Sequence, residues 1–496
     1  MTGQLTPALI LTTIALYFAT LIGISWLTSR RANNADFFIA GRKSPWWLIA
    51  IGMVGASISG VTFISIPGAV GGAGANQAFS YMQMVFGYLL GYFVIATVLM
   101  PVYYRLNLTS IYSYLDQRFG HSSNKTGAAY FLLSRVIGSA FRLYLVAIVL
   151  DRFVLGVPPL NVPFWVTVFI TIVLIWVYTF KGGLKTIIWT DALQALLFLA
   201  AVTMTIVSIG GELGKDLGGL IGMVQQSEYS KIFFFEGGWG DPNNFFKQFF
   251  AGALIAIVMT GLDQDMMQKN ISCPNIRDAQ KNMFTFCIVL VFTNLLFLTL
   301  GALLYLYAGQ TGMELPARSD YLYPMIALEH LSPALGIIFM VGLIAAAYSS
   351  ADSALTALTT SFCVDFLNFE KSDNPEAGQQ RTRRWVHVGF SFVLMGTILI
   401  FKVLNNDAVI NEVFKAAGYT YGPLLGLFTF GMLTKIQIKD SLVIPVCLAA
   451  PVLTWLIVDA SLKYAGFDFG FLNLALNGLL TMAGLWLISK KSPRIS

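Results

Sequence analysis

Residues 52–72 read GMVGASISGVTFISIPGAVGG and lie within an apolar run that extends from residue 46 to residue 71. Such a run is long enough to cross a bilayer, which takes roughly 20 apolar residues. Its glycines and serines lower helix stability, however, and Pro67 removes a backbone donor and clashes with the preceding turn. Non-helical backbone at membrane depth survives only when it is buried in protein or lines a wet cavity. We therefore predict a discontinuous membrane span with free carbonyl groups near the membrane midplane.

Similar apolar runs recur along almost the whole chain. Of its 496 residues, 56% are hydrophobic and only 11% are charged, and the mean hydropathy is +0.70. An ordinary soluble domain carries about 25% charged residues, so too few charges remain here to cover a water-facing surface. We predict an all-α integral membrane protein in a lipid bilayer with about 13 spans, at residues 7–28, 46–71, 77–104, 127–151, 163–180, 187–209, 246–264, 283–308, 333–366, 385–404, 410–434, 441–462 and 469–488.

The basic residues of the short loops predict the orientation of the chain. Most of them, such as Arg42, Arg118, Lys269 and Arg383, follow odd-numbered spans, and few follow even-numbered ones. Because cytoplasmic loops carry the excess of lysine and arginine, we expect the N-terminus outside and the C-terminus inside. The net charge of +6 is then a topology signal, and we expect no nucleic-acid partner.

A second apolar run, 246–264, is also interrupted. It contains Gly252 and Gly261 and ends in the sequence LDQD at 262–265. Two interrupted spans five elements apart fit an inverted repeat that relates spans 2–6 to spans 7–11. Transporters built in this way bind solute and ions where the broken helices meet, although glycine-rich spans also occur at simple helix-packing interfaces.

No long linker or low-complexity segment divides the chain, so we expect a single transmembrane domain over residues 1–496. The stretch 210–245 contains glycine pairs and three consecutive phenylalanines, and it predicts a short helix and turns over an outer vestibule. The expected parts are a first span with an inner loop at 1–45, a first repeat at 46–209, a second repeat at 246–435 and two C-terminal spans at 436–496.

Small and hydroxyl-bearing residues cluster in the ninth span. Ala346, Ser349, Ser350 and Ser353 recur at i, i+3, i+4 and i+7 and so share one helix face. Sodium is a hard cation that takes several oxygen ligands, and hydroxyls on such a face let side-chain and carbonyl oxygens reach a common point. The pattern indicates a sodium site or, alternatively, close helix packing.

Several ionisable residues lie inside predicted spans, where charge is costly and usually faces the bundle interior or a water-filled cavity. Asp191, near the inner end of the sixth span, could hold a second cation or pair with Lys185. Arg135 and Arg142 lie about two turns apart on the fourth span. Because a guanidinium grips a carboxylate through two parallel hydrogen bonds, we expect one of them to bind an anionic substrate. The alternative is that they cap carbonyl groups of a broken helix.

Phe79 and Gln83 lie one turn apart on the third span. They could give a polar solute an aromatic wall and an amide. Such pairs are also common in helix packing, so the pattern alone does not decide between the two roles.

The motifs of several enzyme classes are missing. The sequence contains no HExxH, GxSxG or GxxxxGK[ST] motif, and no GxGxxG between a strand and a helix. We therefore expect transport rather than catalysis, without ATP drive, an organic cofactor or an obligatory protein partner.

Five motifs, in chain order, resemble the sodium/solute symporter family, to which proline, pantothenate and sodium/glucose transporters belong. They are GVTFISIPG at 60–68, WTDALQ at 189–194, DQDMMQK at 263–269, SSADS at 349–353 and GYTYGPLLGLF at 418–428. The match extends over nearly the whole chain, and within the family it looks most similar to bacterial sodium-coupled sialic acid symporters. The resemblance implies a LeuT-like core of two inverted five-helix repeats with broken helices, in the bacterial cytoplasmic (inner) membrane.

The resemblance also implies binding residues for two sodium ions and for an anionic solute. One sodium ion would bind carbonyl groups near Gly55, Ala56, Ile58 and Ala346 and the hydroxyl groups of Ser349 and Ser350. The second would involve Asp191, Ser349, Ser353 and Asp352, an extra acid that not every relative carries. Sialic acid (N-acetylneuraminate) would lie against Ser57, Ser59, Thr62, Phe79 and Gln83. Its carboxylate would face Arg135, with Arg142 as the second choice.

The resulting hypothesis is sodium-coupled import of sialic acid by alternating access, in which sodium orders the broken second span and completes the solute site. The strongest alternative is sodium symport of another small carboxylate or an amino acid such as proline, since a buried arginine does not distinguish them. A proton-coupled carrier could use Asp191 or Asp352 as its relay. A channel would need a repeated filter, which the sequence lacks.

Overall fold

The structure is a computed structural model that describes residues 7–29, 34–72, 74–179, 183–369, 375–404 and 409–490. Within these ranges the chain is helical, and its β-pairing is a single bridge between Ile438 and Ser489. Nine of the described helices are long and apolar enough to cross a membrane, and two bent helix pairs could each form one further span. The predicted all-α membrane architecture is therefore confirmed, while the count of 13 spans stays a prediction.

The helices follow the predicted spans closely. In chain order they are α1 (Pro7–Ser29), α2 (Asn34–Ile39), α3 (Trp46–Ser57), α4 (Gly60–Ala69), α5 (Tyr81–Val94), α6 (Met100–Arg105), α7 (Ser113–Arg118), α8 (His121–Leu150), α9 (Phe164–Thr179), α10 (Leu184–Glu212), α11 (Leu217–Gln225), α12 (Phe245–Ala256), α13 (Gln264–Ile271), α14 (Ile276–Thr311), α15 (Leu322–Met325), α16 (Pro333–Ser361), α17 (Glu376–Leu404), α18 (Val409–Thr420), α19 (Gly422–Leu433), α20 (Val443–Ala465) and α21 (Asn473–Leu487). Single π-helical turns extend α5, α8, α12, α15 and α16.

Both predicted interruptions are present. Helices α3 and α4 are bent by 56° at a break where Ile58 and Ser59 are extended, and the Ser59 side chain accepts a hydrogen bond from the Val61 N–H (3.3 Å). The segment that contains α12 is bent by 64° from α13, and the Asp263 carboxylate at this second break accepts a hydrogen bond from the Asp265 N–H (2.9 Å). In each case a polar side chain caps the helix that follows.

A third interruption was not predicted. The expected continuous span at 410–434 is divided at Tyr421 into α18 and α19, and Pro423 lies in the first turn of α19. Proline lacks a backbone N–H, so Pro423 cannot donate to the Tyr419 carbonyl, which accepts from the Asn477 side chain instead (3.0 Å). The local sequence Gly422-Pro423 therefore explains the break, which the hydropathy of the run conceals.

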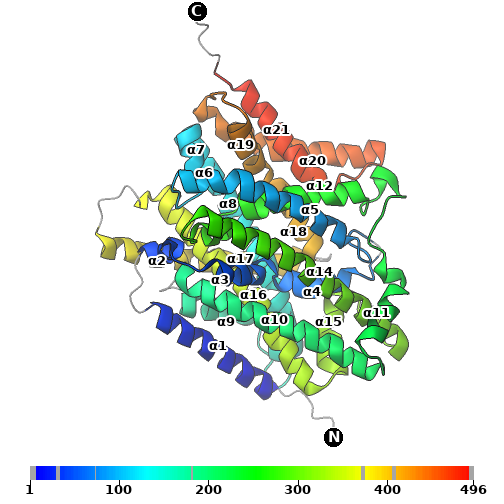
Figure 1. Cartoon of the computed structure of the whole chain (residues 1–496). Helices are drawn as coiled ribbons and strands as arrows, with labels where there is room; N and C mark the ends of the chain where they lie inside the picture. Colours follow the sequence, from blue (N-terminus) through cyan, green and yellow to red (C-terminus); the bar gives the residue numbers. More distant parts are fainter. Residues whose placement is uncertain are drawn as a thin grey trace, which may run out of the picture.

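The bundle has α1 at one edge and α20 and α21 at the opposite edge (Figure 1). Between these edges α10 packs against both α3 and α16, and α12 packs against α5. The α3–α10–α16 contact requires a glycine, because a Cβ atom at Gly55 would lie 2.7 Å from the Asp191 carbonyl oxygen and 2.9 Å from Ser349 Oγ. This packing places the α3–α4 break beside the hydroxyl-rich face of α16.

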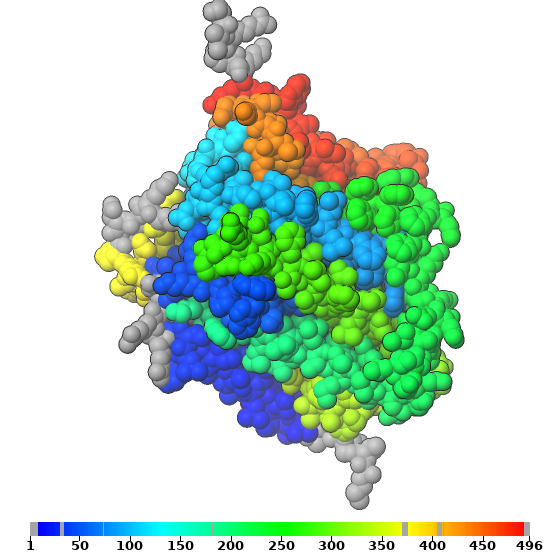
Figure 2. Space-filling model, viewed as in Figure 1, coloured from blue at the N-terminus to red at the C-terminus, as the bar shows by residue number. Residues whose placement is uncertain are grey.

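The predicted helix and turns between the two predicted repeats are also present. Residues 210–245 contain α11 and two 3₁₀ turns, and the green chain atoms of this region cover the right-hand face in Figure 2. The Phe79 N–H donates to the Lys231 carbonyl (3.1 Å) and the Phe234 N–H donates to Gln83 Oε1 (3.1 Å). These bonds join the segment to the start of α5.

Candidate solute cavity and cation site

A cavity of about 90 Å³ lies at the α3–α4 break. Five of the predicted solute-binding residues line it: Ser57, Ser59 and Thr62 from the break, and Arg135 and Arg142 from α8. The other lining residues are Ala56, Ile58, Val61, Tyr81, Tyr88, Tyr92, Ile255, Ala256, Met259, Thr260, Met266, Leu290, Asn294, Val413 and Phe414. The broken backbone therefore borders a cavity, as the physical argument from membrane burial predicts.

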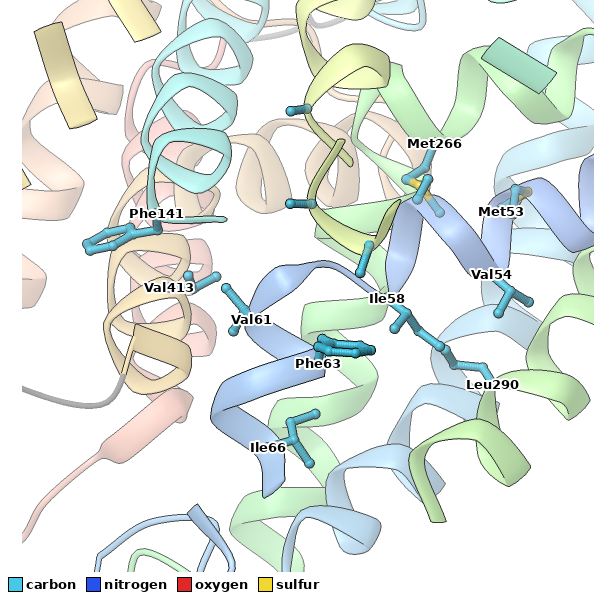
Figure 3. Close-up of a cluster of buried hydrophobic side chains, with 14 of the residues drawn as sticks. Met53, Val54, Ile58, Val61, Phe63, Ile66, Phe141, Met266, Leu290 and Val413 are labelled. Carbon is cyan, nitrogen blue, oxygen red and sulfur yellow. The ribbon is translucent and has the colours of Figure 1, made fainter. Parts of the chain in front are cut away.

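The cavity wall is partly apolar and partly hydroxylated. Figure 3 shows Val61 of α4 pointing toward Val413 of α18, and both residues line the cavity. On the α5 side the Tyr81 and Tyr88 hydroxyls are 2.9 Å apart, and Tyr92 follows one turn after Tyr88. The sequence interpretation missed these tyrosines, although their spacing of seven and four residues places all three on one helix face.

Phe79 and Gln83 do not line this cavity. Helix α5 begins at Tyr81, so Phe79 precedes it, and both side chains are buried. The Gln83 amide donates to the Asn243 carbonyl (2.8 Å) and accepts from the Phe234 N–H (3.1 Å). In this structure Gln83 fastens the segment before α12, and its predicted contact with solute stays a prediction.

The two arginines differ in their partners. Arg135 forms an ion pair with Asp265. Its Nη1 atom also lies 3.6 Å from Oδ2 of Asp263. Arg142 has no carboxylate within 4 Å among the described residues, although it is buried. A buried cation without an anionic partner is costly, so the cavity favours a bound anion near Arg142.

At the predicted second cation position, three side chains donate hydrogen bonds to Asp191. Asp191 of α10 accepts hydrogen bonds from Ser349 Oγ (2.8 Å, to Oδ1) and from Ser353 Oγ (3.1 Å, to Oδ2) of α16. Lys269 of α13 donates to Asp191 Oδ2 at 2.7 Å. The alternative pairing with Lys185 is wrong, because Lys185 contacts Asp36 instead (3.2 Å).

Asp352 faces away from this set. Its Oδ2 atom accepts from the Tyr178 hydroxyl of α9 (2.8 Å), and its Oδ1 atom accepts from the Ser353 N–H (2.5 Å). The neighbouring Ser350 hydroxyl donates to the Ala347 carbonyl of its own helix (3.1 Å). The structure thus brings Ser349 and Ser353 to Asp191 and directs Asp352 toward α9.

The predicted first sodium position combines backbone carbonyls of the α3–α4 break with the hydroxyl-bearing face of α16. In the described part of the chain no hydrogen bond ends on the carbonyl oxygens of residues 55–58. These carbonyls include those of Gly55, Ala56 and Ile58, and Gly55 packs directly against Ser349. Ala346 lies one turn before Ser349 on α16. The donor set of free carbonyls and a hydroxyl fits a hard monovalent cation.

Comparison with known protein families identifies the chain. The model described as "Sodium:solute symporter family" matches residues 37–439. The chain belongs to this family. As predicted from its motifs, this family member has a transporter's multi-pass membrane architecture.

Individual relatives match this family member over most of their length. The sodium/sialic acid symporter NanT of Aliivibrio fischeri is 27% identical over 491 residues, which cover 94% of this chain and 91% of NanT. The sodium/sialic acid symporter SiaT of Proteus mirabilis is 24% identical over 84% of this chain and 83% of SiaT. A solved structure of a Na⁺-coupled sialic acid symporter, substrate-bound and outward-open, superposes with a TM-score of 0.81 at 19% identity, covering 97% of this chain and 99% of that one. The fold is thus shared with that transporter.

The sequence interpretation also missed the roles of Asp263, Asp265 and Lys269. All three belong to the 263–269 motif, which supported the family resemblance without receiving a binding role. The signal was available, because an ionisable residue inside a span usually lies at a functional site. The predicted span stops at residue 264, however, so it excludes Lys269. In the structure α13 continues to Ile271 and places Lys269 against Asp191.

Proposed function

We propose that the chain is a sodium-coupled symporter that imports sialic acid across the bacterial cytoplasmic membrane by alternating access. The observation that carries this proposal is the cavity at the α3–α4 break, which is lined by two buried arginines and lies beside free backbone carbonyls. The similarity to two sodium/sialic acid symporters supports the choice of solute. The positive-inside pattern supports an external N-terminus and a cytoplasmic C-terminus.

The solute carboxylate binds in this cavity between Arg135 and Arg142. Ser57, Ser59 and Thr62 supply hydroxyl groups for a polyhydroxylated solute, and Phe79 and Gln83 remain candidate contacts in a conformation where the segment 231–243 has moved. Arg142, which has no anionic partner among the described residues, gains the most from the carboxylate. Bidentate arginine–carboxylate contacts give both affinity and orientation.

Two sodium ions travel with the solute. The first binds the carbonyls of Gly55, Ala56, Ile58 and Ala346 with the hydroxyls of Ser349 and Ser350. The second binds Asp191, Ser349 and Ser353, and Asp352 joins this set only if its side chain turns away from Tyr178. By linkage, ions that favour the solute-ready state raise solute affinity by the same coupling free energy with which solute favours the ions. Two sodium ions and one carboxylate move one net charge, to which the membrane potential adds about 2.3 kcal/mol per 100 mV.

The test is uptake of labelled N-acetylneuraminate into proteoliposomes under an imposed sodium gradient, with a potassium gradient as control. We expect saturable uptake only with sodium, and a loss of at least about 30-fold in the Arg142→Gln variant, because a buried charge without its partner costs 2–5 kcal/mol. The exposed Arg105 provides the matched control, and Arg105→Gln should leave uptake unchanged.

Two further outcomes separate the alternatives. A methyl ester of N-acetylneuraminate lacks the carboxylate, and it should compete with the labelled acid in neither wild type nor Arg105→Gln. Sodium-dependent uptake of proline without uptake of N-acetylneuraminate would overturn the choice of solute. Uptake that is indifferent to sodium would overturn the coupling.

A further inference from the structure

A row of four buried charges connects the solute cavity to the predicted second sodium position. Arg135 lines the cavity and pairs with Asp265 of α13. Asp265 Oδ1 lies 4.0 Å from Nζ of Lys269, one turn further along the same helix, and Lys269 Nζ lies 2.7 Å from Asp191 Oδ2 of α10. The four side chains are at most 3% exposed. We call Arg135, Asp265, Lys269 and Asp191 the charge row.

Lys269 occupies the place where a cation would meet Asp191. Its ammonium group contacts the same Asp191 oxygen that accepts from Ser353, while Ser349 donates to the other oxygen. A lysine ammonium and a sodium ion carry the same charge, so both cannot hold this carboxylate oxygen at full strength in a buried site. Binding of sodium at Asp191 therefore requires Lys269 to give up this contact.

Asp265 offers Lys269 a second partner. The 4.0 Å separation needs to shorten by only about 1 Å to become a hydrogen bond. The four-carbon lysine stem allows such a shift without movement of the helix. In this structure Asp265 is held by Arg135, so its availability depends on what Arg135 binds.

We propose that Lys269 is a tethered cation that holds Asp191 in the absence of sodium and moves to Asp265 when a solute carboxylate engages Arg135. Lys269 and Asp265 are then positioning residues that couple solute binding to sodium binding. This inference rests on the proposed symport, because the solute carboxylate supplies the signal at Arg135. By reciprocity, sodium at Asp191 displaces Lys269 toward Asp265 and releases Arg135 for the solute.

The first experiment uses sodium alone and needs no solute. The apparent unfolding temperature of the purified full-length protein is measured against sodium concentration, with choline keeping the ionic strength constant. A ligand that binds only the folded protein stabilises it by RT ln(1 + [L]/Kd). A fit of this relation to the curve gives the apparent dissociation constant, which is the half-saturating sodium concentration. We expect Lys269→Gln to lower this concentration about fivefold or more, and Asp265→Asn to raise it about fivefold, the lower range of ordinary coupling factors.

The half-saturating sodium concentration is expected to fall in Lys269→Gln and to rise in Asp265→Asn. These opposite shifts distinguish a lysine that competes with sodium from one that only stabilises the fold. If Lys269 only neutralised Asp191, both variants would destabilise the protein equally in sodium and in choline, and this result would overturn the inference. Lys185→Gln is the matched control, because it removes a lysine–aspartate contact (3.2 Å, to Asp36) outside the charge row. It should leave the half-saturating concentration unchanged.

A double-variant comparison covers the case in which Lys269→Gln does not fold. Asp191→Asn removes the carboxylate for which lysine and sodium compete, and Asp191→Asn with Lys269→Gln removes both members of the pair. The double variant should show the same half-saturating sodium concentration as Asp191→Asn alone. Without the Asp191 carboxylate, Lys269 no longer competes with sodium for a shared partner. A further shift in the double variant would contradict competition.

The second experiment measures the coupling itself. Calorimetry gives the affinity for N-acetylneuraminate with and without saturating sodium, and Asp265→Asn should reduce the ratio of the two affinities about fivefold or more. An unchanged ratio would overturn the role of Asp265. If the wild type binds no N-acetylneuraminate, the choice of solute fails, whereas the sodium titration still decides whether Lys269 competes at Asp191.

Discussion

The two broken helices lie at corresponding places in the two predicted repeats, but the polar groups at the two breaks differ in chemistry. The α3–α4 break contains the uncharged sequence GASIS at 55–59, and its polar groups are backbone carbonyls and serine hydroxyls. The break before α13 contains Asp263, Asp265 and Lys269, and its polar groups are charged side chains. Both helix breaks lie beside the cavity, but only the break before α13 contains charged side chains.

This difference separates two tasks. Carbonyl oxygens on a break have fixed positions and no net charge, so they suit a hard cation at a defined point. Charged side chains act over longer distances in a low-dielectric interior and can exchange partners. The α3–α4 break therefore provides oxygen ligands at fixed positions. The break before α13 provides charged side chains that can change partners when solute or sodium binds.

The largest effect on uptake in this comparison is expected at the uncharged break. A Cβ atom at Gly55 would lie 2.7 Å from the Asp191 carbonyl oxygen, so Gly55→Val must push α3 away from α10 and α16. Overpacking of this kind costs about 1–3 kcal/mol, and we expect sodium-dependent uptake to fall roughly 10- to 100-fold. Gly396 of α17 has no atom within 4 Å of an added Cβ, so Gly396→Val is the control. Normal uptake by Gly55→Val would show that the close contact is dispensable.

The next comparison concerns stability rather than uptake, and it uses the caps of the two breaks. Asp263 caps α13, accepts from the Tyr421 hydroxyl (2.5 Å) and lies 3.6 Å from Arg135. Asp263→Ala should therefore cost about 3–5 kcal/mol, as expected for one lost member of a buried ion pair. Ser59→Ala removes only a neutral cap, which is worth about 1 kcal/mol.

Thermal unfolding of the two cap variants in detergent measures this difference. Asp263→Asn keeps a side-chain oxygen for the cap but removes the charge, so it separates the two contributions. Equal losses of stability in Asp263→Ala and Ser59→Ala would remove the distinction between a charged and an uncharged break.

The smallest effect on sodium binding is expected at Gln83. Its amide joins α5 to the segment before α12 through hydrogen bonds with Asn243 and Phe234. Gln83→Ala should lower the unfolding temperature by the equivalent of about 1–3 kcal/mol for the buried groups left without partners. Its effect on the half-saturating sodium concentration should be less than about threefold. A large rise in the solute concentration needed for half-maximal uptake would instead support the contact between Gln83 and solute implied by the family resemblance.

The sequence was sufficient for the fold because the decisive signals are local. Span length, the glycine and serine content of 52–72 and the early end of 246–264 predict the two breaks without any knowledge of packing. The division at Tyr421 was missed because hydropathy averages over the whole run, whereas the cause is the single dipeptide Gly422-Pro423.

The candidate site was harder because its partners are distant in sequence. Ser57, Ser59 and Thr62 meet Arg135 and Arg142 at one cavity, but no spacing rule indicates which carboxylates face each arginine. Lys185 is the near neighbour of Asp191 in sequence, yet Lys269, 78 residues away, is its partner. Such pairs follow from how α10, α13 and α16 pack, which a single sequence does not encode in any local pattern.

The division at Tyr421 has a consequence for motion. Val413 and Phe414 of α18 line the cavity, whereas α19 packs more extensively than α18 against α21. Hinges are a few residues at the ends of elements that absorb a change of backbone direction, and Tyr421 stands at such a position between two helices. Access to the cavity can therefore change through a tilt of one 12-residue helix, while the scaffold beside it stays still. Spin-label distances from α18 to α21 and from α19 to α21 should then change on solute binding in the first pair and stay constant in the second.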